Sequence, residues 1–182
     1  MAVQQPDLEL KGRDKVESLR RRAREALAHS AHCSGVSLGI LKKDDHGAPL
    51  PFNGVHWSLT HKESFVAAVT APHPIGIDIE KVRPFNAALH QRLAGDGEWA
   101  LAPEVTQTLF FRYWTAKEAV LKAVGKGMVG LSDCRIVAIV DDSHLIVTFQ
   151  DSKWTVAQYW GTKDHIVAVT ADHVEIQWHR IE

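Results

Sequence analysis

The chain contains 182 residues, of which 45% are apolar and 24% are charged, and its formal net charge is −1. A net charge this close to zero excludes a protein that relies on overall positive charge to bind nucleic acid, and it gives no preference for an acidic partner. No run of about 18 apolar residues occurs and residues 1–15 lack the hydrophobic core of a signal peptide, so we expect a cytoplasmic protein that does not enter a membrane.

The first predicted element is a basic amphipathic helix near the N-terminus. Its apolar positions follow helical spacing, and basic residues occupy many of the remaining positions. The apolar positions are Val16, Leu19, Ala23 and Leu27, and the basic residues are Lys11, Arg13, Lys15, Arg20, Arg21, Arg22 and Arg24. A basic face of this kind can meet an anionic ligand or an acidic partner, although a solvated helix face explains it equally well.

A short strand is predicted at 36–41, followed by a β-hairpin at 55–59 and 64–70. Lys42 and Lys43 end the predicted strand and precede a turn region at 47–53. The prolines that follow the hairpin end its second strand.

Residues 76–80, with the sequence Gly-Ile-Asp-Ile-Glu, are predicted to form the next strand because their apolar members are β-branched. Side chains alternate across a strand, so Asp78 and Glu80 share one face while Ile77 and Ile79 occupy the other. Two carboxylates this close raise each other's pKa unless a cation lies between them. Acidic pairs are also common on half-buried strands, so this pair alone does not define a site.

A long helix is predicted from 106 to 124, with Gly125 at its end. Glu118 and Lys122 lie four residues apart in the order that favours an ion pair, which on a helix surface is worth only about 0.2–0.5 kcal/mol. Together with the acids of the preceding strand, this helix supplies a third carboxylate and the ammonium groups of Lys117 and Lys122. Such a set can hold a divalent cation and a phosphate chain.

The C-terminal third is predicted to form antiparallel strands. Their ranges are 135–140, 145–150, 154–160 and 166–170. Cys33 and Cys134 are far apart in the sequence and lack metal-binding spacing, so reduced thiols are expected. Neither His29-x-x-His32 nor His46 has Cys or acidic partners at zinc spacing, and most of the histidines are expected at the surface.

Two segments resemble the paired signature of the 4'-phosphopantetheinyl transferase superfamily. Residues 76–80, Gly-Ile-Asp-Ile-Glu, contain the G-(I/V)-D of the (V/I)-G-(I/V)-D pattern, and residues 114–122, Trp-Thr-Ala-Lys-Glu-Ala-Val-Leu-Lys, match every fixed position of (F/W)-(S/C/T)-x-K-E-(A/S)-x-x-K. Because the second pattern fixes many positions at defined spacing, the paired match is specific.

A third segment, which runs from Phe52 to His61, is similar to the F-N-(I/L)-S-H-S element of the same family. Thr60 stands where Ser is usual, Lys62 replaces the second Ser, and additional residues separate Asn53 from His61. The whole resemblance covers residues 52–130.

The resemblance implies an α/β (α+β) fold. A long segment precedes Asp78, so the chain resembles the surfactin-synthetase-activating (Sfp) branch rather than the short, trimeric holo-acyl-carrier-protein synthases. That branch implies a monomer in which two similar α/β halves form an intramolecular pseudo-dimer with the active site between them. We place the halves at 1–72, which would contact coenzyme A, and at 73–182, which carries the metal-binding motifs.

The resemblance also implies an activity, namely transfer of 4'-phosphopantetheine from coenzyme A to a serine of an apo acyl or peptidyl carrier protein, with release of 3',5'-ADP. The expected metal is Mg²⁺ or Mn²⁺, bound by Asp78, Glu80 and Glu118. Glu118, or a water that it orients, would accept the serine proton.

Other residues are expected to contact the coenzyme. Lys117 and Lys122 would contact phosphate oxygens, and His61 would form a hydrogen bond with a phosphate. Lys42 and Lys43 are further candidates for coenzyme A binding. Glu98 lies where the family has a Glu, but its surroundings match poorly, so it is not included in the catalytic set.

Two other functions stay open. A catalytically silent module that binds carrier proteins would keep the fold, although it would have no use for three mutually repelling carboxylates. A metal-dependent phosphohydrolase acting on coenzyme A or a nucleotide would use water in place of the serine. The sequence does not encode whether a carrier protein of fatty acid, polyketide or non-ribosomal peptide synthesis is served.

Overall fold

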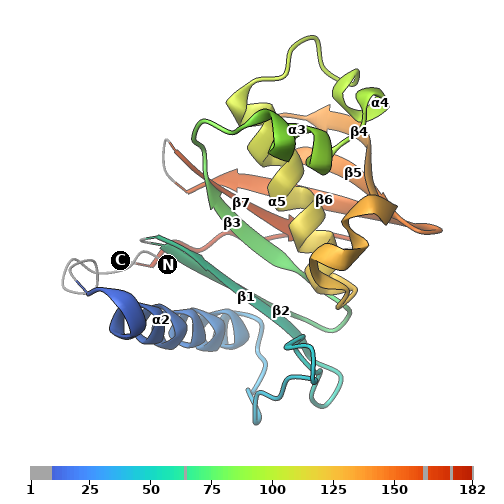
Figure 1. Ribbon diagram of the computed structural model, residues 1–182. Coiled ribbons are helices and arrows are strands. Elements are labelled where there is room, and N and C mark those ends of the chain that lie inside the picture. The colour runs from blue at the N-terminus through green and yellow to red at the C-terminus, as the bar shows by residue number, and fades with distance from the viewer. Residues whose placement is uncertain (1–9, 64, 162–163, 173, 182) are drawn as a thin grey trace.

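The computed structural model describes residues 10–63, 65–161, 164–172 and 174–181 (Figure 1). The helices are α2 (Gly12–Cys33), α3 (Ala87–Leu93), α4 (Asp96–Trp99), α5 (Gln107–Ala123) and the 3₁₀ helix η1 (Gly127–Asp133). The strands are β1 (His56–Lys62), β2 (Phe65–Ala71), β3 (Ile77–Lys81), β4 (Cys134–Asp141), β5 (His144–Phe149), β6 (Ser152–Trp160) and β7 (His165–Thr170). The mixed α+β class predicted from the sequence is confirmed.

The strands form two antiparallel sheets. β1 and β2 make a hairpin, and the second sheet has the order β3-β7-β6-β5-β4. Helix α2 packs on the hairpin, whereas α5 crosses one face of the five-stranded sheet (Figure 1). The N-terminal part therefore consists of α2 on the two-stranded hairpin, and the C-terminal part has α5 on the five-stranded sheet. Both parts place one long helix on antiparallel strands, but they differ in the number of strands.

β1 and β3 link the two sheets. The two strands lie side by side without belonging to one ladder, and the Ile77 amide donates a hydrogen bond of 3.2 Å to Ser58 Oγ. The first residues of β3 also pack against α5. The strand that carries the acidic motif therefore lies between the hairpin and the long helix.

Helix α5 begins and ends close to the predicted limits. The Thr106 hydroxyl accepts a hydrogen bond from the Leu109 amide, which satisfies one of the free donors of the first turn. Gly125 follows the helix with φ of +68°, a conformation in which glycine carries no steric penalty. Between these ends, Tyr113, Val120 and other apolar side chains are fully buried against the sheet.

The hairpin and the C-terminal strands are confirmed with small shifts of their ends, and all four C-terminal strands are antiparallel. The predicted second hairpin strand began at Ser64, which lies outside the described residues. Three further helices, α3, α4 and η1, occupy regions for which the sequence indicated no regular element.

The strand predicted at 36–41 is wrong. These residues form irregular structure, and the side chain of Ile40 is 80% exposed. Alternating apolar residues favour a strand only where a neighbouring strand can pair with them, and the described structure offers none here. Among the described residues, no helix is both long enough and apolar enough to cross a bilayer.

Candidate functional site

Strand β3 presents its two acids toward α5. Ile77 and Ile79 are buried in the core cluster with Val167 and Val169, on the opposite face of the sheet. Asp78 is only 6% exposed. The alternation predicted from the sequence is therefore confirmed, and it places the acids against the helix that carries the second signature segment.

Gly76 allows this close packing. A Cβ atom at this position would lie 1.8 Å from the carbonyl oxygen of Ala119 on α5, well inside van der Waals contact. Only glycine fits here because the backbones of strand and helix approach each other directly. The glycine that precedes the acidic pair thus sets the distance between β3 and α5.

Lys122 joins the two elements. Its Nζ donates hydrogen bonds to Asp78 Oδ1 at 2.6 Å and to the carbonyl oxygen of Ile77 at 3.1 Å. Asp78 Oδ1 also accepts a hydrogen bond of 3.2 Å from the Thr60 hydroxyl on β1. Its other oxygen, Oδ2, is buried and has no hydrogen-bond partner among the described residues.

Glu118 lies one helical turn before Lys122 and is half-buried. Burial raises the pKa of its carboxyl, the negative charge of Asp78 adds to this effect, Lys122 opposes it, and Glu80 raises the pKa slightly further. No hydrogen-bond donor to this carboxylate is found in the described part of the chain. The three predicted acids are thus close enough to influence one another.

Glu80 is already paired. Lys62 Nζ lies 2.9 Å from its Oε1 and 2.7 Å from its Oε2. Burial nevertheless raises the pKa of Glu80, with Lys62 opposing the effect and Asp78 adding to it. Lys62 stands where the family pattern has Ser, so this ion pair is a feature of this chain that the motif did not predict.

His61 lies on the face of β1 opposite to Thr60 and Lys62, the two residues that contact Asp78 and Glu80. Leu59, two residues earlier on the same face, packs against α2, and His61 is exposed. Partial burial lowers the pKa of the imidazole, and the positive charges of Lys122, Arg20 and Lys62 lower it further. An anion near His61 would relieve this repulsion, and Arg20 of the basic helix would lie close to it.

The structure does not bring Lys117 to this cluster. Lys117 is 1% exposed, and its Nζ contacts Glu98 Oε1 at 2.6 Å and the carbonyl oxygen of Leu93 at 2.7 Å. Glu98 also accepts hydrogen bonds from the backbone amides of Gly95 and Ile136. The expectation that Lys117 contacts phosphate does not fit this geometry, because its ammonium is already satisfied inside the protein.

A small cavity of about 250 Å³ lies beside Lys122, the residue that contacts Asp78. Its lining residues include Lys43, Lys122 and Lys126 as well as His46, and Gly47 to Pro49 form part of its wall. Residues 47–49 belong to a turn that is closed by a hydrogen bond from the Leu50 amide to the Lys42 carbonyl oxygen. Lys43 thus lines the same cavity as Lys122, whereas the exposed Lys42 is not among its lining residues.

Lys126 and His46 are candidate residues that were not predicted. The sequence offered one signal for Lys126: it lies four residues after Lys122, and this spacing keeps it on the same side as Lys122 just beyond the end of α5. We define the acidic cluster as Asp78, Glu80 and Glu118, and the basic cavity as the space lined by Lys43, Lys122 and Lys126. Lys122 lines the basic cavity and also contacts Asp78 of the acidic cluster, so candidate cation-binding and anion-binding groups are joined through this lysine.

The chemistry of the acidic cluster suits a hard divalent cation, although its three carboxylates do not all lie within 4.8 Å of one another in this arrangement and would have to close on the ion. It offers carboxylate oxygens alone, and Asp78 Oδ2 and the Glu118 carboxylate lack protein donors in the described structure. Mg²⁺ and Mn²⁺ prefer such oxygen ligands. A cation there would also offset the mutual repulsion that raises the pKa of Glu118.

Comparison with known proteins identifies the family of the chain. A family model described as the 4'-phosphopantetheinyl transferase superfamily matches residues 74–170, which is more than half of the chain and includes the whole acidic cluster. The chain therefore belongs to this superfamily. The family assignment made from the paired motifs is confirmed.

Individual relatives carry the same family name. The chain is 27% identical over 162 residues to a 4'-phosphopantetheinyl transferase of Bacillus subtilis, covering 84% of this chain and 70% of the relative. It is 37% identical to HetI of Nostoc sp. over 56% of this chain and 49% of HetI, and 29% identical to Sfp of Bacillus subtilis strain 168 over 53% and 45%. The chain spans about half the length of most of the curated relatives that it matches.

Proposed function

We propose that this protein transfers 4'-phosphopantetheine from coenzyme A to a serine hydroxyl of an apo carrier protein and releases 3',5'-ADP. The observation that carries the proposal is that Lys122, which lines the basic cavity, also contacts Asp78 of the acidic cluster. Phosphoryl transfer needs groups that neutralise a pyrophosphate and a group that accepts a proton, positioned together. The family names of the relatives support the same reaction.

Asp78, Glu80 and Glu118 would hold Mg²⁺ or Mn²⁺. When bound, the cation would neutralise charge on the pyrophosphate oxygens. Lys62 would have to share Glu80 with the cation, because its ammonium already contacts both oxygens of that carboxylate.

The basic cavity would take the phosphates of coenzyme A. Lys122 would exchange part of its contact with Asp78 for a phosphate oxygen, and Lys43 and Lys126, which line the same cavity, would add positive charge. His61 and Arg20 would lie toward the α2 side, where a further phosphate would relieve the repulsion that lowers the pKa of His61. Lys42, exposed beside this turn, would contribute only at the rim.

Glu118 is our candidate for the proton acceptor. Its carboxylate is half-buried, has no donor within the described structure, and has a raised pKa, which makes it a stronger base than an ordinary glutamate. It would accept the serine proton directly or through a water that it orients. The attacking oxygen would then form a bond to phosphorus as 3',5'-ADP leaves.

We also propose that residues 1–72 and 73–182 act as the two halves of one monomeric unit in the cytoplasm. In the described structure, β1 of the first part supplies Thr60 and Lys62 to acids on β3 of the second. This arrangement fits a site made by both halves of a pseudo-dimer. A carrier protein would then approach the edge where the two parts meet.

The test is incubation of the purified chain with coenzyme A, Mg²⁺ and several apo carrier proteins, followed by intact mass spectrometry. A mass gain of one phosphopantetheine that disappears with EDTA and in Glu118→Ala and Asp78→Ala supports the transferase. Near-normal turnover in either variant would overturn the site. Release of 3',5'-ADP without carrier modification would favour the hydrolase, and coenzyme A binding without turnover on any carrier would favour the silent module.

A further inference from the structure

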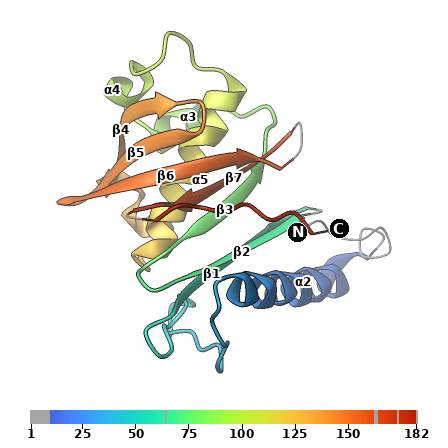
Figure 2. The ribbon, with the colours of Figure 1, turned by 180° about the vertical axis from the view of Figure 1, so that it is seen from behind.

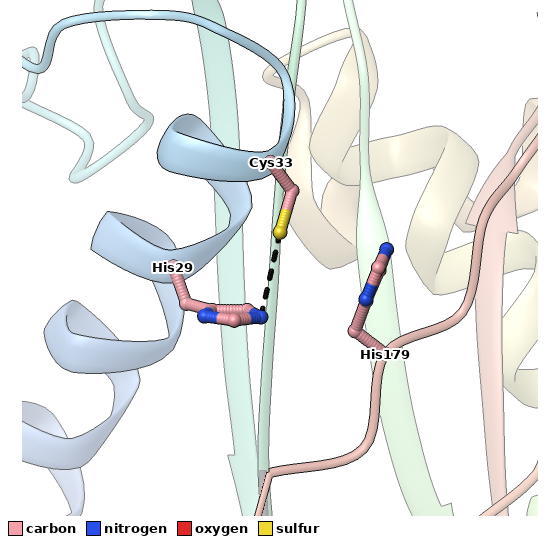
Figure 3. A group of neighbouring side chains, drawn as sticks. All are labelled: His29, Cys33 and His179. Atoms are coloured by element: carbon pink, nitrogen blue, oxygen red, sulfur yellow. Dashed lines mark hydrogen bonds between the residues drawn. The ribbon is translucent and has the colours of Figure 1, made fainter.

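Three metal-ligating side chains meet where the C-terminal segment, residues 174–181, passes the end of α2. His29 and Cys33 lie one helical turn apart on α2, and His179 approaches them from the segment (Figure 3). One ligand atom of each residue lies within 4.8 Å of the others. Segments far apart in the sequence thus meet here, and α2 lies across the hairpin from α5 (Figure 2).

We propose that His29, Cys33 and His179 form a binding site for Zn²⁺, which fixes the C-terminal segment to α2. Imidazole nitrogen and thiolate sulfur are the ligands that Zn²⁺ prefers, and three protein ligands leave a fourth position for water. On binding, Cys33 would lose its proton and coordinate as a thiolate, so one proton is released for each ion bound.

The distances are close to those of a tetrahedral site. Two ligands at the usual zinc bond lengths lie about 3.6 Å apart for a sulfur and a nitrogen, and about 3.3 Å apart for two nitrogens. Cys33 Sγ lies 3.4 Å from His29 Nε2. The ligand atom of His179 is within 4.8 Å of the other two, so a small side-chain adjustment would complete the set. The i, i+4 spacing on α2 is the one that places both zinc histidines of a helix on the same face.

The backbone near His179 is held by other contacts. The ring of Trp178 stacks on Tyr159 of β6 at a centroid distance of 5.2 Å, and Ile176 packs against the core that contains Ile77 and Val169. The ring of His179 meets that of His29 edge-on, at 5.8 Å and 70°. Little chain entropy would therefore be lost when His179 becomes a ligand, because its neighbours are already packed.

From the sequence we expected neither a Cys or acidic partner at zinc spacing for His29-x-x-His32 nor a metal-binding spacing between Cys33 and Cys134; the proposed site pairs His29 with Cys33 instead. The third ligand, His179, lies 146 positions beyond Cys33 along the chain, so its approach could not be read from local spacing. The site is distinct from the acidic cluster, since a thiolate and two imidazoles suit a softer ion than three carboxylates do.

Cobalt is the most direct probe, because Co²⁺ in place of Zn²⁺ shows a thiolate charge-transfer band. The full chain has two cysteines, and Cys134 is fully buried, so such a band must come from Cys33. The titration is carried out with Mg²⁺ in excess, and the affinity for Zn²⁺ is then measured by competition with a chelator. The variants are His29→Gln, Cys33→Ser and His179→Gln, with His32→Gln on the exposed side of α2 as the matched control.

We expect one equivalent of Co²⁺ to give the thiolate band. Each of the three variants should lose at least roughly 10- to 100-fold in Zn²⁺ affinity, because losing a direct ligand should cost no less than losing an outer-shell partner. His32→Gln should bind like the wild type. Zn²⁺ should also protect the C-terminal segment from proteolysis in the wild type and not in His179→Gln. Absence of the band, or unchanged Zn²⁺ affinity in Cys33→Ser or His179→Gln, would overturn the site and leave the His29–Cys33 hydrogen bond as the whole interaction.

Discussion

The Lys122 ammonium lies 2.6 Å from Asp78 Oδ1, and this ion pair joins the two signature segments of the chain across β3 and α5. Asp78 is buried, whereas Lys122 also lines the basic cavity. The same ammonium can therefore stabilise the buried acid before a ligand binds and contact an anion afterwards. The spacing of the second motif matters because it places Lys122 one turn beyond Glu118, at the boundary between cation-binding and anion-binding groups.

Gly76→Ala tests whether the approach of β3 to α5 sets the site. The added methyl group would lie 1.8 Å from the Ala119 carbonyl oxygen, which is backbone and cannot rotate away. Strand and helix must separate, so we expect a loss of about 3 kcal/mol or more in the free energy of unfolding, measured by urea denaturation. The distance between Asp78 and Lys122 should grow, and transferase activity at a temperature where the variant is still folded should fall.

The matched control for this change is Gly97→Ala on α4, where an added Cβ meets no atom within 4 Å. This variant should unfold like the wild type. Equal stability of the two variants would show that the contact between Gly76 and Ala119 does not constrain the fold.

Glu118→Gln should stabilise the protein at neutral pH while it removes a proposed catalytic group. A raised pKa means that the folded protein favours the protonated carboxyl, so the ionised form destabilises the fold at any pH above the folded pKa. This penalty is absent below the ordinary value of 4.5, where the carboxyl is protonated in both states. The Tm of Glu118→Gln should therefore exceed that of the wild type at pH 7 and approach it as the pH falls below 4.5.

The measurement is the Tm of both proteins from pH 4 to pH 8, without and with excess Mg²⁺. This range runs from roughly the ordinary pKa of a carboxylate to above that of histidine. Added Mg²⁺ should stabilise the wild type more than Glu118→Gln, because a ligand stabilises the state that binds it. A lower Tm for Glu118→Gln at pH 7 would mean that Glu118 has a stabilising partner, contrary to the described contacts.

The sequence predicted the acidic cluster better than its surroundings. Alternation along β3 and helical spacing along α5 are local properties, so Asp78, Glu118 and Lys122 could be placed on their faces from the sequence alone. The strand predicted at 36–41 failed because pairing depends on a distant partner. For the same reason neither the burial of Lys117 against Glu98 nor the meeting of His179 with α2 could be predicted.

Lys117→Met separates the structural role of this lysine from the predicted phosphate contact. Lys117 and Glu98 form a buried ion pair at 2.6 Å, and Glu98 also binds two backbone amides. Removing the ammonium leaves a buried carboxylate without its counter-charge, so we expect a loss of about 3–5 kcal/mol in the free energy of unfolding. The affinity for coenzyme A, measured by calorimetry on the folded fraction, should change little.

Lys153→Met, an exposed lysine on β6, is the matched control and should leave the free energy of unfolding unchanged. The double variant Glu98→Gln/Lys117→Met should be more stable than Lys117→Met alone, because the unpaired charge is removed with its partner. A large loss of coenzyme A affinity in Lys117→Met with little loss of stability would instead support the predicted contact between Lys117 and a phosphate.

Lys62→Ser replaces the residue that departs from the family pattern with the one that is usual there. Lys62 contacts both oxygens of Glu80, so a cation that binds the acidic cluster has to compete with its ammonium. Without Lys62 the cluster carries one more uncompensated negative charge and should bind Mn²⁺ roughly fivefold more tightly, corresponding to about 1 kcal/mol for a partly exposed pair. Mn²⁺ binding, followed by electron paramagnetic resonance of the free ion, measures this directly.

Lys81→Ser is the appropriate control, because Lys81 adjoins Glu80 in the sequence but pairs with Glu63 and Asp164 instead. It removes the same charge without freeing a proposed ligand, so any gain in Mn²⁺ affinity should be smaller than in Lys62→Ser. Equal gains would show that overall charge, rather than the contact with Glu80, determines metal affinity. Weaker Mn²⁺ binding in Lys62→Ser would mean instead that Lys62 positions Glu80 for the cation, since without its ammonium the carboxylate would turn away from Asp78 and Glu118.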